Sequence, residues 1–403
     1  MLKIRKIDVL DVACIIISVV LLVVSPSIYM LRNLENVYIA GSIFLMVSLF
    51  LVLLKVRHYK LKRYQIIFMA ALILIDTLLF WISGADSGTG YYILGFGFIY
   101  FAFLSFILDT DNRYDTLLEV VVLVITALAI ISLFFWLFGS LFHIIQSTDY
   151  IRIDWGGVYR VKNYYNIYFE PQNTLFNAGE INIKVRNCAF FAEGPVCNFF
   201  FSTGLLLNEF YVVSKRKIID IILLLAVFST LTTSGIMVLL LYFFYKLMKI
   251  QTRRKIGKVF KFVFLVIALV SFLIIGLGAL KDKLMTGSGI VRLSRFTAEF
   301  AAFRNNIIFG NGINSFTNGS SNSFAALLAD GGILLWSMYY LPIFGKIAYK
   351  LFKRKEIDYF SLIFGFVFAI TVVQYTLFTV FVVILMWKEF LEIILKHKVV
   401  NSK

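Results

Sequence analysis

Residues 116–143 read TLLEVVVLVITALAIISLFFWLFGSLFH, an apolar run in which Glu119 is the only acidic residue. An α-helix needs about 20 apolar residues to cross the hydrocarbon core of a bilayer. The run therefore predicts a membrane-spanning helix. Similar runs recur along the whole chain, and the clear ones are 9–29, 37–54, 66–83, 91–108, 190–213, 259–280 and 324–345.

The composition agrees with a membrane protein. Of 403 residues, 60% are hydrophobic, 17% are aromatic and only 15% are charged, whereas soluble domains carry about 25% charged residues. The 39 Lys and Arg outnumber the 23 Asp and Glu, and the net charge is +16. The basic residues lie in short clusters between apolar runs, such as KVRHYKLKR (55–63), SKRK (214–217) and KLFKRK (350–355). Such clusters mark the cytoplasmic loops of membrane proteins, so we expect no nucleic-acid partner.

Two apolar stretches, 218–245 and 359–395, are too long for one helix and short for two. Basic clusters bound each stretch at both ends. A hairpin of two short helices keeps both clusters on the cytoplasmic side. The first stretch is expected to break near Thr232 and the second near Gln374. The alternative for 218–245 is one helix, which would place the cluster KIQTRRKIGK (249–258) outside.

These assignments predict an all-α integral membrane protein of about 12 transmembrane helices, because unpaired backbone groups are not tolerated in lipid. We expect one domain over residues 1–403 with both termini in the cytoplasm. Two long polar segments then lie outside, at about 144–188 and 281–323. The first is rich in tyrosine and contains Trp155.

The second outer segment contains GIVRLSRFTAEFAAFRNN (289–306), whose phenylalanines form one stripe at helical spacing. Arg292 and Arg295 lie beside this stripe, and Arg304 flanks its other edge. Basic residues are usually kept on the cytoplasmic side, so these arginines favour an anionic ligand. The guanidinium group matches pairs of phosphate oxygens. The alternative is a surface helix whose arginines reach lipid head groups.

The segment VRNCAFFAEGPVCNFFFSTG (185–204) leads into the apolar run 190–213. Arg186 precedes the run and Glu193 lies at its outer mouth. A carboxylate in this position is costly unless it is paired or functional. Glu193 is therefore a candidate general base, and a structural clamp between Glu193 and Arg186 is the alternative.

Two further acids are candidates. Asp330 follows the polar patch NGSSNS (318–323) by about two helical turns and precedes two glycines. Asp76 lies in the middle of the run 66–83, where an acid is a functional candidate by default. We favour a structural hydrogen bond for Asp76, although it is also the best indication of a transporter.

Taken in order, these segments resemble the O-antigen polymerase and ligase superfamily, most closely the Wzy-type polymerases of capsular polysaccharides and exopolysaccharides. The matching pattern is the Arg186-to-Glu193 entry, the Thr-Ser-Gly hairpin tip, and the paired arginines followed by FGNG and SSNSFAALLADGG. The resemblance implies a bacterial, multi-pass plasma-membrane glycosyltransferase of the GT-C type. It implies transfer of a glycan chain from undecaprenyl diphosphate to a second lipid-linked repeat unit at the outer membrane face.

The resemblance also implies roles for individual residues, without a metal or another cofactor. A flippase and a chain-length regulator are implied partners. The diphosphate ligands would be Arg186, Arg292, Arg295 and Arg304. The catalytic carboxylates would be Glu193 and Asp330. The sugar or acceptor contacts would be Trp155, Tyr159, Tyr164 and Asn322.

One departure from the family pattern concerns the general base. The family often has His-Asn where this chain has Ser321-Asn322. The role of base would then pass to Glu193 or Asp330, or the reaction would depend more on activation of the leaving group.

Two other functions are alternatives. A ligase would transfer the finished glycan to a different acceptor. A flippase or another transporter is the alternative from a different class; transporters commonly contain internal repeats, and we find no matching halves in the sequence.

Overall fold

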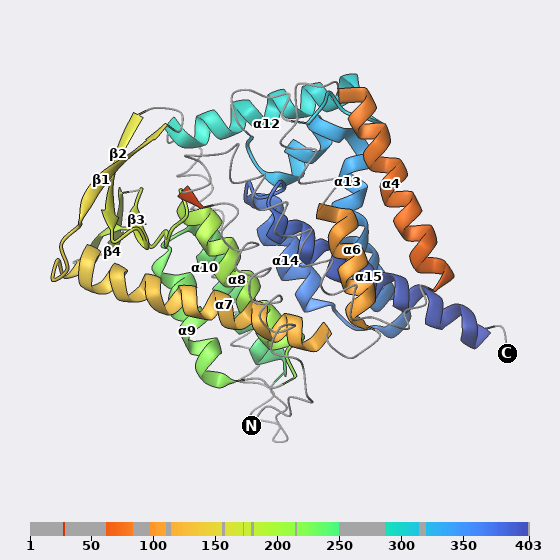
Figure 1. Ribbon diagram of the computed structural model, residues 1–403, viewed down its shortest axis with the longest axis horizontal. Helices are drawn as coiled ribbons and strands as arrows, with labels where there is room; N and C mark the ends of the chain where they lie inside the picture. The colour runs from red at the N-terminus through yellow and green to blue at the C-terminus, as the bar shows by residue number, and fades with distance from the viewer. Residues whose placement is uncertain are drawn as a thin grey trace.

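The computed structural model describes residues 27–28, 62–83, 97–109, 114–154, 158–171, 173–178, 181–213, 216–249, 287–313 and 320–401 (Figure 1). The structural statements below concern these residues. The predicted spans 37–54 and 259–280, nearly all of 9–29, and Trp155 lie outside them.

The described chain is mostly helical. Its helices are α4 (Arg63–Ser83), α6 (Gly97–Asp109), α7 (Tyr114–Phe135), α8 (Gly194–Phe210), α9 (Lys217–Ser229), α10 (Thr233–Lys249), α12 (Gly287–Asn305), α13 (Ser323–Tyr349), α14 (Tyr359–Ile370) and α15 (Leu377–Asn401). Two π-helical turns, η3 (Trp136–Leu141) and η4 (Lys350–Arg354), extend α7 and α13. Two of the described helices, Tyr114–Leu141 and Ser323–Arg354, are long and apolar enough to cross a membrane. The number of about 12 spans stays a prediction.

The outward faces of several helices are apolar. On α7, for example, Leu123, Ile130 and Phe134 are exposed, and on α9 Ile221 and Leu225 are exposed. Isolated apolar side chains are common on protein surfaces, but continuous apolar faces are not. Lipid chains would cover such faces at no cost in hydration, so these surfaces agree with a bilayer environment.

Both predicted helix breaks are present. α9 ends at Ser229 and α10 begins at Thr233, so a single helix over 218–245 is wrong. The hydroxyl of Thr232 accepts a hydrogen bond from Gly235 N at 2.9 Å and caps the start of α10. α14 ends at Ile370 and α15 begins at Leu377, on either side of the predicted break.

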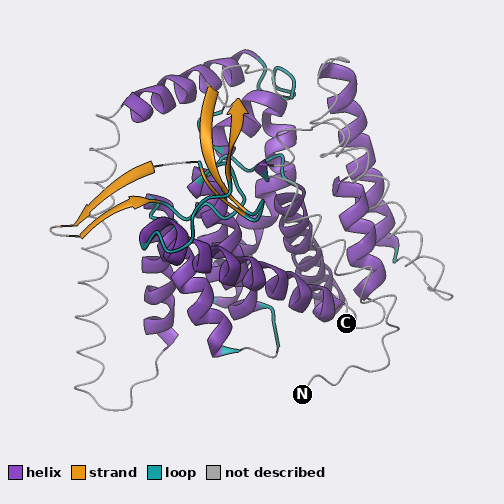
Figure 2. Cartoon of the chain, turned by 60° about the vertical axis from the view of Figure 1, so that its left-hand side comes forward, coloured by secondary structure: helices purple, strands orange, loops and turns teal. Residues whose placement is uncertain are grey.

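The segment 144–188, which the sequence predicts to lie outside the membrane, differs from the all-helical expectation. It forms a three-stranded antiparallel sheet of β1 (Asp149–Asp154), β2 (Val158–Tyr164) and β3 (Tyr168–Glu170), and a separate hairpin of β4 (Asn173–Ala178) and β5 (Ile181–Val185). The all-α prediction is therefore wrong here. The requirement for helices applies only to backbone inside lipid. Outside it, strands can pair freely, and the alternating β-branched and aromatic residues of VYRVKNY favour them. Figures 1 and 2 show the strands and α12 toward the same end of the molecule.

A buried carboxylate anchors the three-stranded sheet to the end of α7. Glu170 on β3 accepts hydrogen bonds from Ser140 of η3 at 2.6 Å and from Tyr164 at 2.7 Å. Lys162 forms an ion pair with it at 3.2 Å. Tyr168 also lies within 3.1 Å of Ser140. These contacts give the outer sheet a defined position on the helical core.

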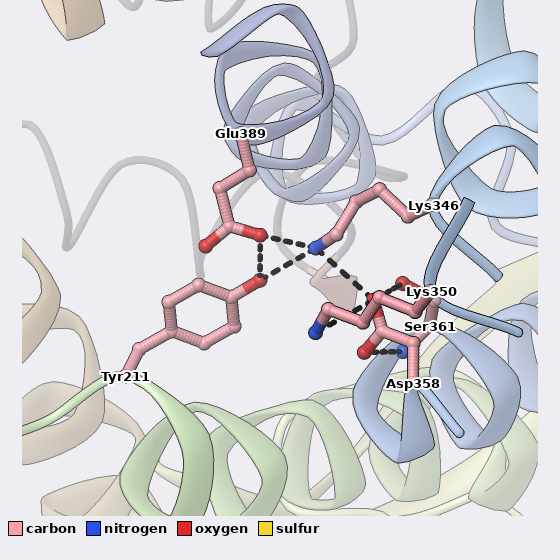
Figure 3. Close-up of polar contacts among 6 residues, drawn as sticks. All are labelled: Tyr211, Lys346, Lys350, Asp358, Ser361 and Glu389. Atoms are coloured by element: carbon pink, nitrogen blue, oxygen red, sulfur yellow. Dashed lines mark hydrogen bonds and ion pairs between the residues drawn. The ribbon is translucent and has the colours of Figure 1, made fainter. Parts of the chain in front are cut away.

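A second buried polar cluster ties four helices together (Figure 3). Lys346 of α13 is 1% exposed and forms ion pairs with Glu389 of α15 and with Asp358, 3.7 Å away, before α14. It also donates to the hydroxyl of Tyr211, which follows α8, at 3.2 Å. Lys350 pairs with Asp358 at 3.3 Å. Burial raises the pKa of Asp358, but these two lysines outweigh it and hold the pKa below its usual value.

Basic side chains gather near this cluster. The contacting helices α8 and α9 are joined by a short connection that ends at Arg216, directly before Lys217 at the start of α9. The connection between α13 and α14 contains Lys353, Arg354 and Lys355. The chain reverses direction at each of these two connections. Each connection therefore lies at the C-terminal end of the helix before it, away from the N-terminal ends of α8 and α13. The outer sheet and α12 lie toward those N-terminal ends (Figure 1).

Candidate functional site

The candidate site begins in the segment between β5 and α8. β5 ends at Val185, and Ala189 adopts a left-handed backbone (φ 50°) that turns the chain toward α8. α8 then starts at Gly194, with Pro195 in its first turn, where a proline costs no hydrogen bond. The first turn of a helix presents unpaired N–H groups and a positive potential. Arg186 and Glu193 lie at the two ends of this short segment.

Arg186 is half-buried against the turn between α9 and α10. A Cβ built on Gly194 would lie 3.3 Å from Arg186 Cδ and 3.2 Å from Thr232 Cγ2, so Gly194 leaves room for both side chains. The Nε atom of Arg186 is buried and has no hydrogen-bond partner among the described residues. A buried guanidinium donor without a partner is unusual in a folded protein and indicates a place for an acceptor.

Arg292 of α12 lies close enough to Arg186 to lower its pKa. Burial is the main cause that lowers the pKa of Arg186; Cys188 and Glu193 oppose this, and Arg292 acts with it. Burial raises the pKa of the Cys188 thiol to about 12, so the thiol is neutral at pH 7. Arg186, Arg292 and Glu193 therefore combine two guanidinium ions with one carboxylate, and together they carry more positive than negative charge.

The segment 289–306 is helical, as predicted. α12 crosses the end of the helical bundle, and Phe296 stacks on Phe300 with ring centroids 6.0 Å apart on its partly exposed stripe (Figure 1). Arg295 lies one turn from Glu299 and favours its ionised form. Arg304 is exposed in the last turn, about 18 Å along the helix axis from Arg292. Of the predicted arginines, Arg292 lies close enough to Arg186 to lower its pKa, and Arg304 lies at the far end of α12.

Glu299 is a site residue to which the sequence analysis assigned no role. It is 1% exposed, and its carboxylate accepts hydrogen bonds from Ser321 N at 3.0 Å and from the Ser321 hydroxyl. Burial raises its pKa, while the bonds from Ser321 and the charge of Arg295 oppose the rise. This contact fixes the middle of α12 to the start of α13. One feature of the sequence could have identified it: Glu299 is the only acidic residue in the stretch 289–306.

Asn322 has a structural role at the start of α13. Its side-chain oxygen accepts from Ala325 N at 2.9 Å, which caps the helix. Its amide nitrogen donates to the hydroxyl of Ser321 at 3.1 Å. The polar patch therefore organises the α12–α13 junction, and the acceptor contact expected for Asn322 stays a prediction.

The two other candidate acids lie elsewhere. Asp330 is buried in α13, where Tyr375 donates to its carboxylate and Gly312 N donates to its backbone carbonyl at 2.9 Å. These contacts join α13 to the connection between α14 and α15 and to the loop after α12. Asp76 lies on α4, and one of its carboxylate oxygens is buried without a hydrogen-bond partner among the described residues. The structural hydrogen bond favoured for Asp76 is therefore not seen in the described part of the chain.

The aromatic residues of the outer segment divide into buried and exposed ones. Tyr164 is 2% exposed, donates to Glu170 and packs on Gly139, so no face of its ring is open to a sugar. Tyr159 lies on β2, and its side chain is outside the described part. Tyr165, which adopts a left-handed backbone in the turn after β2, is 59% exposed. Tyr165 is a better candidate than Tyr164 for sugar stacking.

Within the described residues, no group of three or more His, Cys, Asp and Glu side chains is placed to hold a metal ion. Comparisons of this chain with protein-family models, with characterised proteins and with solved structures find no match. Its function is therefore inferred from its own residues and their arrangement.

Proposed function

We propose that this protein is a multi-pass bacterial membrane glycosyltransferase that polymerises the repeat units of a capsular polysaccharide or exopolysaccharide. Its donor is a glycan chain on undecaprenyl diphosphate, and its acceptor is the terminal sugar of a second lipid-linked repeat unit. The observation that carries the proposal is the buried Nε of Arg186, which has no partner among the described residues, in a guanidinium group whose pKa is affected by the charges of both Arg292 and Glu193.

The charge of this group suits a diphosphate. Two guanidinium ions and the N-terminus of α8 attract an anion, and one carboxylate neutralises only part of this charge. The free Nε of Arg186 offers a donor that no described residue uses. A diphosphate bound here would place the sugar that it carries near Glu193. The arginines would also stabilise the negative charge that grows on the diphosphate as it leaves.

The reaction balances with these residues alone. The acceptor hydroxyl oxygen forms a bond to the anomeric carbon of the donor while the bond from that carbon to the diphosphate oxygen breaks. Glu193 takes the proton of the hydroxyl. The lipid diphosphate leaves with the bonding electron pair, paired with Arg186 and Arg292.

The proposed orientation places α12 and both sheets outside the cell and the Lys346 cluster toward the cytoplasm. Two helices long and apolar enough to cross a membrane support a membrane location. The basic connections after α8 and α13 lie away from α12, which agrees with the rule that cytoplasmic loops carry the positive charge.

Deletion of the gene tests the class of activity. A polymerase deletion should accumulate single repeat units on the lipid carrier at the outer face and should lose long polymer. Repeat units confined to the cytoplasmic face would instead identify a flippase, and the proposal would be abandoned. Unchanged polymer on the lipid carrier, with loss of its final attachment, would identify a ligase.

Single substitutions test the site. Arg186→Ala and Arg292→Ala should abolish long polymer without lowering the amount of protein in the membrane. Glu193→Gln should fold and be inactive. Arg160→Ala is the matched control, because Arg160 is an exposed arginine of the outer sheet. Normal chain length in both Arg186→Ala and Arg292→Ala would remove the diphosphate role.

A further inference from the structure

Asn187, the residue after Arg186, is 0% exposed and makes four hydrogen bonds. Its backbone N–H donates to Ser229 O at 3.0 Å. Its side-chain amide donates to the hydroxyls of Ser132 at 3.2 Å and Ser229 at 2.9 Å. Its side-chain oxygen accepts from Ala189 N at 3.0 Å. One side chain thus joins α7, the end of α9 and the turn that leads to α8.

The directions of these hydrogen bonds explain why residue 187 is an asparagine and not an aspartate. The hydroxyl of Ser132 donates to Ala129 O at 3.0 Å, and that of Ser229 donates to Ala226 O at 2.7 Å. Both hydroxyl protons are committed to helix carbonyls, so each hydroxyl oxygen can only accept from residue 187. The amide nitrogen of Asn187 supplies both donors, and Ala189 N–H fixes the opposite end of the amide. An aspartate of the same shape would place a carboxylate oxygen against two acceptors.

The anchored segment is the one that carries the candidate site. Arg186 precedes Asn187 directly, and its Nε makes no hydrogen bond within the described chain. The position of its guanidinium therefore depends on its backbone and on packing beside Gly194. Glu193 lies at the other end of the same short segment. Movement of this segment would change the distance from Arg186 to Glu193 and the distance from Arg186 to Arg292.

We propose that Asn187 is a positioning residue, which holds Arg186 and Glu193 in register for a diphosphate by donating to Ser132 and Ser229. This inference rests on the proposed function, because it requires Arg186 to bind the anion. It deepens that proposal by identifying the contacts that orient the arginine, which itself lacks a described hydrogen bond at Nε.

The test measures the affinity of the purified full-length protein in detergent for inorganic pyrophosphate. Asn187→Asp should weaken this affinity by roughly 10-fold, because one or both donated hydrogen bonds are lost. Arg186→Ala serves as the reference for loss of the anion ligand. Asn208→Asp is the matched control: Asn208 is also buried, and its amide donates to Asp220 at 2.7 Å, but it lies at the other end of α8. Asn208→Asp should lower the thermal unfolding midpoint and leave pyrophosphate affinity within about 2-fold of wild type.

Three results would overturn the inference. If Asn187→Asp binds pyrophosphate as wild type while Arg186→Ala does not, Asn187 has no positioning role and the diphosphate site stands. If Arg186→Ala also binds as wild type, the diphosphate site fails and the positioning role fails with it. If Asn208→Asp weakens binding as much as Asn187→Asp, the effect is one of general stability.

A second variant covers the case in which Asn187→Asp does not fold. Ser229→Ala removes one acceptor of the Asn187 amide and introduces no charge. It should weaken pyrophosphate affinity by about 5-fold, the value of one ordinary hydrogen bond. Wild-type affinity in Ser229→Ala would then contradict the inference.

Discussion

Gly332→Ala should release α12 from α13 and lower the stability of the whole protein. Gly332 interrupts α13 with a left-handed backbone (φ 60°, ψ −157°), a region that is almost restricted to glycine. A Cβ at this position would lie 2.5 Å from the carbonyl carbon of Ile308 and 2.6 Å from the carbonyl oxygen of Ile307. Both are backbone atoms of the loop after α12, so the clash cannot be relieved by a side-chain rotation.

The expected cost follows from two contributions. Holding a side chain in this backbone region costs on the order of 1–3 kcal/mol. Moving the loop away breaks two hydrogen bonds, from Ile333 N to Ile307 O at 2.8 Å and from Leu334 N to Ile308 O at 3.2 Å. Each contributes about 1 kcal/mol. The sum of about 3–5 kcal/mol is a large part of the 5–15 kcal/mol that stabilises an ordinary domain.

The assay is the unfolding midpoint of the purified protein in detergent, together with its affinity for pyrophosphate. Gly97→Ala is the matched control, because a Cβ there would meet only the flexible side chains of Leu377, at 3.2 Å, and Val380, at 3.6 Å. It should cost less than about 1 kcal/mol. Gly332→Ala should also weaken pyrophosphate binding, since α12 carries Arg292. Equal unfolding midpoints for Gly332→Ala and Gly97→Ala would refute the close approach of the two backbones.

Three further predictions concern buried charges. Lys346→Met removes the lysine partner of Glu389, whose side chain is 32% exposed, and should lower the free energy of unfolding by about 1–3 kcal/mol, measured by denaturant titration in detergent. No measurable change would contradict the ion pair. Burial raises the pKa of Glu299 above its usual value of 4.5, so the folded state holds the proton to higher pH than the unfolded state. Wild-type stability should therefore fall as the pH rises from about 4.5 through the raised pKa, and Glu299→Gln should lack this fall; identical pH profiles would be evidence against it. Glu170→Leu removes the acceptor of Ser140 and should cost about 1–3 kcal/mol, seen as a lower unfolding midpoint, unless the sheet is anchored in another way.

Several features of the fold followed from local sequence. The run 116–143 predicted a helix, and α7 with η3 occupies Tyr114–Leu141. The polar interruptions near Thr232 and Gln374 predicted the breaks between α9 and α10 and between α14 and α15. These features depend on apolar length and on the capping preferences of a few neighbouring residues, which a sequence displays directly.

The outer sheets were harder to foresee. Alternation in VYRVKNY is a weak signal over a few residues, and the requirement for helices holds only for backbone inside lipid. The burial of Tyr164 could not be predicted either, because the sequence does not distinguish Tyr164 at the end of the strand from Tyr165 in the turn that follows. Tyr164 faces η3 and Tyr165 faces solvent, and only the register of β2 decides between them.

By itself the sequence determined which segments are apolar enough to form helices in a membrane, where the helices break, and which arginines escape the clusters between spans. Those properties are set by residues within a few turns of each other. Only the tertiary structure decided that Arg292 lies close enough to Arg186 to lower its pKa, that Glu299 holds α12 to Ser321, and that Asn187 anchors the segment between β5 and α8. Each of these interactions joins residues from different elements, and the packing of helices, rather than any local preference, sets the distance between such residues.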